Sequence, residues 1–136
     1  MVRKEDYVAL AGFRKALRRF LRFAEEGARE AGITPQQHQV LLAIAGRPNR
    51  DWASISELSD SLQLKHHATV GLVDRCQSAG LVRRTQNPDD RRIVQVSLTP
   101  AGEDIVRRLT LRNVATVREL GKMTEDLEEL RDRVRD

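Results

Sequence analysis

The side chains with the clearest chemistry in this chain are basic ones between Lys65 and Arg92, although residues 1–23 also carry an excess of positive charge. Residues 65–92 carry six Lys or Arg residues and three Asp or Glu residues, within a chain of 136 residues whose net charge is +4. Lys65, His66 and His67 form one group, and Arg91 and Arg92 form another. Ammonium, guanidinium and imidazole groups can donate hydrogen bonds to phosphate oxygens and base edges. The local excess of positive charge therefore indicates a polyanionic partner.

Patterns that would indicate catalysis or metal binding are missing from the sequence. It contains no glycine-rich phosphate loop, no nucleophile elbow and no paired-carboxylate motif. His66 and His67 are adjacent, so on a helix their side chains point about 100° apart and make a poor metal pair. We therefore expect a protein that is not an enzyme and that carries no cofactor and no metal.

Two short helices are predicted to position the first basic group. Ser54 and Glu57 have the spacing of a capping box, and apolar residues at helical spacing follow them. A break precedes a second helix over about residues 66–79, which Gly80 ends in a left-handed conformation. The buried face of this second helix is predicted to consist of Thr69, Leu72, Val73 and Cys76.

A hairpin is predicted to position the second basic group. Residues 87–90 read Asn-Pro-Asp-Asp, which is typical of a turn, and alternating apolar residues follow it. Residues 53–55 could pair as a third short strand beside the hairpin. Two helices with a tight break and then a basic hairpin make a winged helix-turn-helix. Its second helix fits a DNA major groove, and the wing tip can reach the minor groove or the backbone.

Two stretches of the chain form recognisable motifs. They are PDDRRIVQVSLTPAG, residues 88–102, and LVDRCQSAGLVRR, residues 72–84. In these motifs the sequence resembles the MarR family of bacterial transcription regulators. The sequence departs from the family pattern in that Gln63 stands where the turn often has Gly. The resemblance implies a mainly α fold with a small β-hairpin wing, and N- and C-terminal dimerisation helices. It also implies that Arg92 is the wing arginine, in a D-x-R pattern that Asp90 heads.

The DNA contacts expected from this reading divide into phosphate and base contacts. We expect the phosphate contacts to come from the basic side chains, and Asp90 to orient the wing. Arg75 could instead be a surface charge beside Asp74. Val70 can offer only methyl contact, and Gly71 would permit a close backbone approach. The expected DNA-binding residues are Lys65, His66, His67, Val70, Gly71, Arg75, Arg91 and Arg92.

Long helices with apolar stripes are predicted at both ends of the chain, over residues 4–30 and from residue 100 onward. The second carries a heptad seam that is too long for the small body to cover, so we expect a second copy to pair with it. Asn113 could fix the register of that pairing or bond locally. Gly121 and Thr124 could break the region into two helices, or it could be one. The expected dimerisation residues are Leu10, Phe13, Leu17, Leu109, Asn113, Leu120, Leu127 and Leu130.

Three further residues have two readings each. In families like this one, ligands can bind between the DNA-binding part and the dimerisation helices. His38 and Trp52 are therefore candidates for an effector pocket. His38 could equally be a structural histidine, and Trp52 could simply pack its loop. Cys76, the only cysteine, is expected to be a small core residue rather than a redox sensor, because it falls on a buried face.

Together these features predict a single domain over residues 1–136, with a winged helix-turn-helix part at 33–99 and dimerisation parts at 1–32 and 100–136. The expected function is a homodimeric, sequence-specific regulator of transcription that binds double-stranded DNA at a pseudo-palindromic operator. We expect it to be a repressor that a small-molecule effector releases. The alternatives are a protein-interaction module and a nonspecific architectural DNA-binding protein. The chain shows no secretory pattern and no apolar run of transmembrane length, so we expect a cytoplasmic protein without membrane contact.

Overall fold

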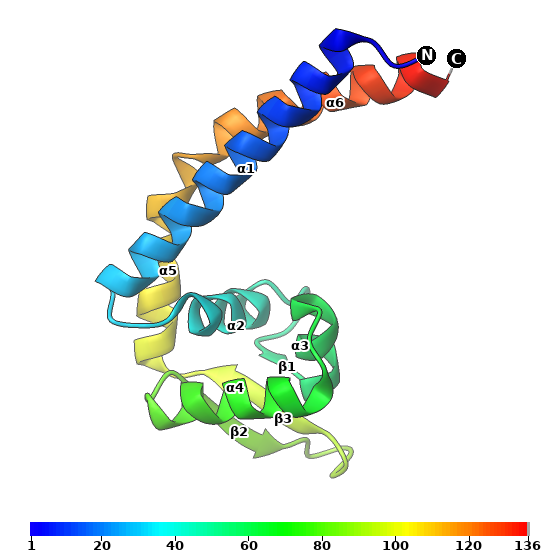
Figure 1. The fold of residues 1–136 in the computed structure, drawn as a ribbon. Helices are drawn as coiled ribbons and strands as arrows, with labels where there is room; N and C mark the ends of the chain where they lie inside the picture. The colour runs from blue at the N-terminus through cyan, green and yellow to red at the C-terminus, as the bar shows by residue number, and fades with distance from the viewer. Residues whose placement is uncertain (136) are drawn as a thin grey trace.

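The computed structural model describes residues 1–135, and it shows a head and a long arm (Figure 1). The head contains α2, α3, α4 and a small sheet, and the arm consists of α1 lying along α6, with α5 joining the two parts. Both termini lie at the far end of the arm. The elements are α1 (Lys4–Glu30), α2 (Pro35–Ala45), β1 (Trp52–Ala53), α3 (Ile55–Leu62), α4 (His66–Ser78), β2 (Val82–Gln86), β3 (Val94–Leu98), α5 (Pro100–Val114) and α6 (Val117–Arg135).

The sheet of the head is antiparallel, with strand order β1-β3-β2. β2 and β3 form the predicted hairpin, with Val82 opposite Leu98. The predicted third strand exists, but its position at residues 53–55 was partly wrong. Trp52 and Ala53 pair with β3, because Ser54 is the N-cap of α3 and Ile55 begins that helix. The predicted capping box between Ser54 and Glu57 is confirmed.

The core of the head lies between α2, α4 and the sheet. Thr69, Leu72, Val73 and Cys76 are all buried, which confirms the predicted inner face of α4. The Thr69 hydroxyl accepts a hydrogen bond from the Ser59 hydroxyl at 2.9 Å and donates to the Lys65 carbonyl at 3.0 Å. These bonds tie α3 to α4 and fix the angle at which α4 leaves the turn.

The turn between α3 and α4 places Gln63 in the left-handed region, with φ of 55°. A side chain is strained there and glycine is not, so we predict that Gln63→Gly raises the free energy of unfolding by about 0.5–1 kcal/mol. The gain is limited because the Gln63 side chain donates a hydrogen bond to the Asp60 carbonyl. Urea denaturation measures the change. Asn49→Gly is the control, because Asn49 also has a positive φ but asparagine tolerates it better. A destabilised Gln63→Gly variant would contradict the prediction.

The C-terminal region consists of two helices, and the break lies at Ala115 and Thr116. The Thr116 hydroxyl donates a hydrogen bond to the Asn113 carbonyl at 2.7 Å. The suggested break at Gly121 and Thr124 is wrong, because both residues lie inside α6. The Thr124 hydroxyl donates to the Leu120 carbonyl one turn earlier, so it does not cap a helix.

The heptad seam packs against α1 of the same chain, and its pairing with a second copy stays a prediction. Leu109 and Asn113 are buried within this chain, and the seam leucines of α6 are half-buried where α6 runs along α1 (Figure 1). Phe13 and Leu17 are half-buried too, whereas Leu10 is exposed. Helix α1 therefore covers part of the apolar seam. Other apolar side chains of the arm remain exposed, namely Val8, Leu10, Leu21, Leu111, Val114 and Val117.

No helix within residues 1–135 combines the length and the apolar character that a membrane crossing requires.

Candidate nucleic-acid interface

The N-terminal end of α4 is the first part of the site. Lys65, His66 and His67 are all exposed there. Lys65 is the N-cap, and its side chain makes no hydrogen bond to the first turn. The first backbone bond of the helix runs from the Thr69 amide to the Lys65 carbonyl, so the amides before Thr69 have no helical acceptor. This end therefore offers open amide groups and a cationic side chain to an anion.

Further along α4, Val70 and Gly71 are partly exposed on the same helix, and Arg75 is exposed. A Cβ atom on Gly71 would meet only the Arg75 guanidinium, at an ordinary contact distance of 3.6 Å. Packing among residues 1–135 thus gives no steric reason for glycine at this position. The expected close approach of DNA at Gly71 stays a prediction.

The wing tip is ordered by its own side chains. The Asn87 side-chain oxygen accepts hydrogen bonds from the amides of Asp89 and Asp90, at 2.8 and 3.0 Å. The Asp90 carboxylate accepts from the backbone amide, Nε and Nη2 of Arg92, at 3.0–3.1 Å. The Arg92 guanidinium holds the pKa of the Asp90 carboxyl below its usual value. Asp90 therefore fixes the direction of Arg92, whose side chain is still 90% exposed.

Arg91 is the second basic residue of the wing tip. It is exposed, and no carboxylate of the described chain lies within ion-pair distance of it. The wing tip thus carries one oriented and one free guanidinium group.

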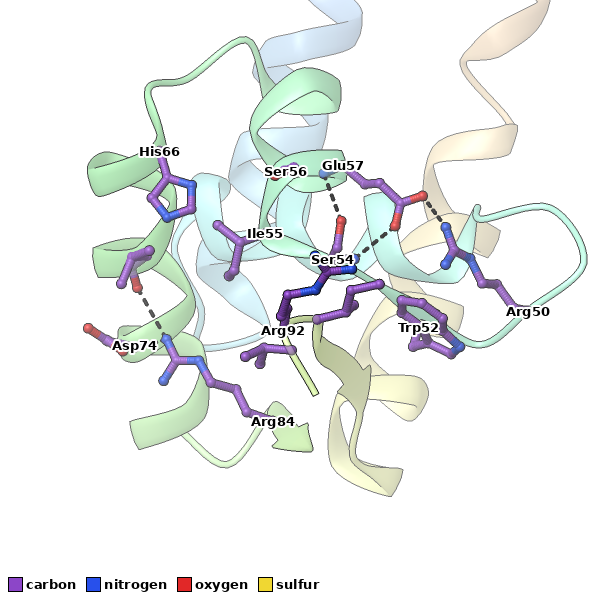
Figure 2. Close-up of a pocket in the computed structure, with 13 residues that line it drawn as sticks. Arg50, Trp52, Ser54, Ile55, Ser56, Glu57, His66, Asp74, Arg84 and Arg92 are labelled. Carbon is purple, nitrogen blue, oxygen red and sulfur yellow. Dashed lines mark hydrogen bonds and ion pairs between the residues drawn. The ribbon is translucent and has the colours of Figure 1, made fainter. Parts of the chain in front are cut away.

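A hollow lies between α4, the wing and the start of α3, and we call it the reading-face hollow. Its volume is about 780 Å³. Figure 2 shows that its wall brings together residues from both predicted groups and from elsewhere in the head. The lining includes Arg50, Trp52, His66, Val70, Arg84 and Arg92.

Two arginines of this hollow were missed in the sequence. Arg84 on β2 reaches α4, where it pairs with Asp74 (Figure 2). It also donates a hydrogen bond to the Gln77 side chain at 2.8 Å. Alternation along the strand could have revealed it, because Arg84 is two residues after the buried Val82.

The other missed arginine is Arg50, which lies in a loop and gave no periodic signal. Its guanidinium carbon sits 3.9 Å from the centre of the Trp52 ring, and it pairs with Glu57 (Figure 2). Burial raises the pKa of Glu57, but hydrogen bonds from Ser54 and the charges of Arg50 and Arg47 outweigh it, so the pKa is lowered. Glu57 remains ionised and holds Arg50 at the rim of the hollow.

A second hollow lies between the arm and the head, and we call it the arm–head cavity. Its volume is about 520 Å³, and α1, α2, α5 and α6 line it with residues that include Phe20, Glu25, His38, Leu42, Asn113 and Val117. Burial lowers the pKa of His38. Trp52 lines the reading-face hollow instead, so the expectation that His38 and Trp52 wall one pocket is wrong. Pairing of Trp52 with Ser97 on β3 holds it beside the wing.

Cys76 is fully buried, and burial raises its pKa to about 11, with Arg75 opposing the shift. At pH 7.5 fewer than about one thiol in a thousand is then ionised, so we predict that iodoacetamide alkylates the folded protein at least about 100 times more slowly than the urea-unfolded protein. Mass spectrometry over time measures both rates. Rapid alkylation of the folded protein would contradict the core role.

Within residues 1–135 no cluster of His, Cys, Asp and Glu is suited to a metal ion.

The α3–α4 pair and the β2–β3 wing define a winged helix-turn-helix protein. The profile of the MarR family matches residues 31–93, which include α2, α3, α4, β2 and the wing tip and end just before β3. Over this region the chain is similar to the MarR family, in agreement with the resemblance of its central motifs.

Relatives extend the likeness to the arm. The repressor MdtR of Bacillus subtilis is 29% identical over 102 residues, which are 74% of this chain and 64% of MdtR. The regulator YsmB of B. subtilis is 35% identical over 75 residues, which are 55% of this chain and 51% of YsmB. A crystal structure of a cysteine-to-serine mutant of MarR from Escherichia coli with operator DNA is 28% identical, with 89% of both chains covered and a TM-score of 0.69. The chain thus matches between half and two thirds of the length of these B. subtilis relatives, whose names describe a transcriptional regulator and a transcriptional repressor.

Proposed function

We propose that this protein is a homodimeric repressor that binds a specific sequence in double-stranded DNA and is released by a small-molecule effector. The observation that carries the proposal is the shared face of α4 and the wing. Both project from the end of the head that lies away from the arm (Figure 1), and their basic groups flank the reading-face hollow. Two similarities support the proposal. One is to the crystal structure of an E. coli MarR mutant with operator DNA, and the other is to MdtR, which is named a repressor.

In this proposal the contacts divide as the chemistry of the side chains suggests. Lys65, Arg91 and Arg92 bind phosphates, and Arg75 does so further along α4. His66, His67 and Val70 meet base edges in the major groove, where Val70 suits a thymine methyl group and Gly71 allows the backbone to approach.

We propose that two copies dimerise through the exposed apolar residues of the arm. Residues 33–99 of each copy then form a DNA-binding part. Leu111, Val114 and Val117 follow one side of α5 and the start of α6, and each is about half exposed or more. We predict a sedimentation mass of twice the 15.5 kDa chain, and a single-chain mass for Leu111→Glu/Val117→Glu. Ser78→Glu, on the head, is the control and should remain dimeric. A double variant that is still dimeric, with an unchanged circular dichroism spectrum, would contradict this interface.

The arm–head cavity is the proposed effector site. It touches the arm and the head, and Val114 and Val117 belong both to its wall and to the proposed dimer face. A ligand that binds one arrangement of arm and head more tightly shifts the population toward that arrangement. The spacing of two reading heads would change with it.

Enrichment of random duplex DNA on the purified protein at physiological salt tests the proposal. A two-fold symmetric motif, with half-sites about one helical turn apart, is the expected result. Retention without a motif would favour a nonspecific architectural role. The absence of retention would overturn DNA binding in favour of a protein-interaction module.

A further inference from the structure

Two residues that line the arm–head cavity each have a buried polar atom with no hydrogen-bond partner among the residues described. The atoms are Nε2 of His38 and Oδ1 of Asn113, and their residues are only 7% and 8% exposed. Buried polar groups are nearly always paired, and an unpaired one costs about 1–3 kcal/mol. The two residues belong to different helices, α2 and α5, and both line this cavity. These two residues suit a ligand that forms hydrogen bonds with both side chains.

The charge of the cavity wall restricts that guest. The lining residues include no Lys and no Arg, and Glu25 is the one ionisable carboxylate among them. Within the described chain, no cation lies within ion-pair distance of Glu25. Burial favours the neutral form of His38, so it adds no positive charge near neutral pH.

The nearest cations lie outside this wall. Lys15, Arg18, Arg19 and Arg22 line a separate, shallower hollow on α1, which shares only Leu21 and Glu25 with the cavity. These four side chains are exposed, so water screens them. A carboxylate placed beside Asn113 and His38 would lose its hydration and find no cation.

We propose that the arm–head cavity binds a neutral or cationic apolar molecule and discriminates against anions. The apolar body of the ligand packs on Phe20, Leu42 and Val117, and its polar group bonds to Asn113 and His38. An amine on the ligand gains further from Glu25. This inference rests on the proposed effector site, and it names the chemical class of the effector.

Three probes with one aromatic body test the proposal by isothermal titration calorimetry, without DNA. They are 2-naphthamide, 2-naphthylmethylamine and 2-naphthoate. We expect the amide and the amine to bind at least about tenfold more tightly than the carboxylate, which is the effect of one unpaired charged or polar group. Binding of the carboxylate as tight as that of the amide would overturn the proposal. No binding by any of the three would overturn it as well, and would leave a cavity filled only by water.

Variants separate a ligand role from a structural one. Asn113→Leu should weaken amide binding about tenfold or more while leaving the urea midpoint unchanged or raised, because it removes an unpaired polar group. A structural role would lower the midpoint instead. Glu25→Gln should remove the advantage of the amine over the amide and leave the amide unaffected. Because no DNA is present, ligand binding without a DNA motif would overturn the proposed function alone, whereas a DNA motif with anion binding would overturn this inference alone.

Discussion

Replacement of both wing-tip arginines by glutamate is expected to abolish duplex DNA binding at physiological salt. Arg91 is free and exposed, and Arg92 is held by Asp90 with its side chain directed to solvent. The change replaces two phosphate-binding cations by two anions, so each contact becomes repulsive. We expect the affinity to fall by more than about 100-fold, and Arg91→Ala/Arg92→Ala to lower the slope of log K against log salt by about two. Fluorescence anisotropy of a labelled duplex across a salt series measures both effects.

A matched charge reversal on the arm is the control for this experiment. Arg118 and Lys122 are exposed on α6, away from the reading face, and their replacement by Glu changes the net charge by the same amount. If the wing acts through local phosphate contacts, this control should reduce the affinity much less. An equal loss in the two variants would mean that total charge, and not the wing, governs binding. Unchanged binding in the wing variant would contradict phosphate contacts by Arg91 and Arg92.

The elements of the head were predictable because their signals are local. A capping box, a buried stripe at helical spacing and a turn sequence each depend on residues within a few positions of one another. Ser54 with Glu57, the inner face of α4 and Gly80 at its end, where φ is 75°, are all as expected. The family motifs fall in this same region of the chain.

The arm and the second cavity were not predictable in the same way, because they depend on contacts between distant residues. The heptad seam has the same pattern whether its partner is α1 or a second copy, and the ion pair of Asp6 with Arg133 joins opposite ends of the chain. His38 and Asn113 line one cavity only because α2 and α5 pack together. Period-two and period-3.6 patterns give the face of an element but not its neighbour.

Gly102→Ala is expected to be the most damaging single methyl addition in this fold. A Cβ atom at Gly102 would lie 2.2 Å from the Leu81 carbonyl oxygen, which is a backbone atom that cannot rotate away. That carbonyl also accepts a hydrogen bond from the Thr99 amide at 3.0 Å, and the Thr99 hydroxyl donates to the Gly80 carbonyl at 2.6 Å. The start of α5 is thereby fastened to the start of β2. We expect the free energy of unfolding to fall by about 3 kcal/mol or more, with a melting temperature lower by on the order of 10 °C.

The same substitution at Gly121 should have the opposite sign. Gly121 lies inside α6, and a Cβ atom there meets nothing within 4 Å among the residues described. Alanine is favoured over glycine in a helix by up to about 1 kcal/mol, so Gly121→Ala should raise the free energy of unfolding. Urea denaturation of both variants separates the effect of the steric contact at Gly102 from the effect of helix propensity, because both variants add the same methyl group. Equal changes in the free energy of unfolding at the two positions would contradict a tight contact between Gly102 and Leu81. A large loss at Gly102 alone would agree with a close backbone contact between the start of α5 and Leu81.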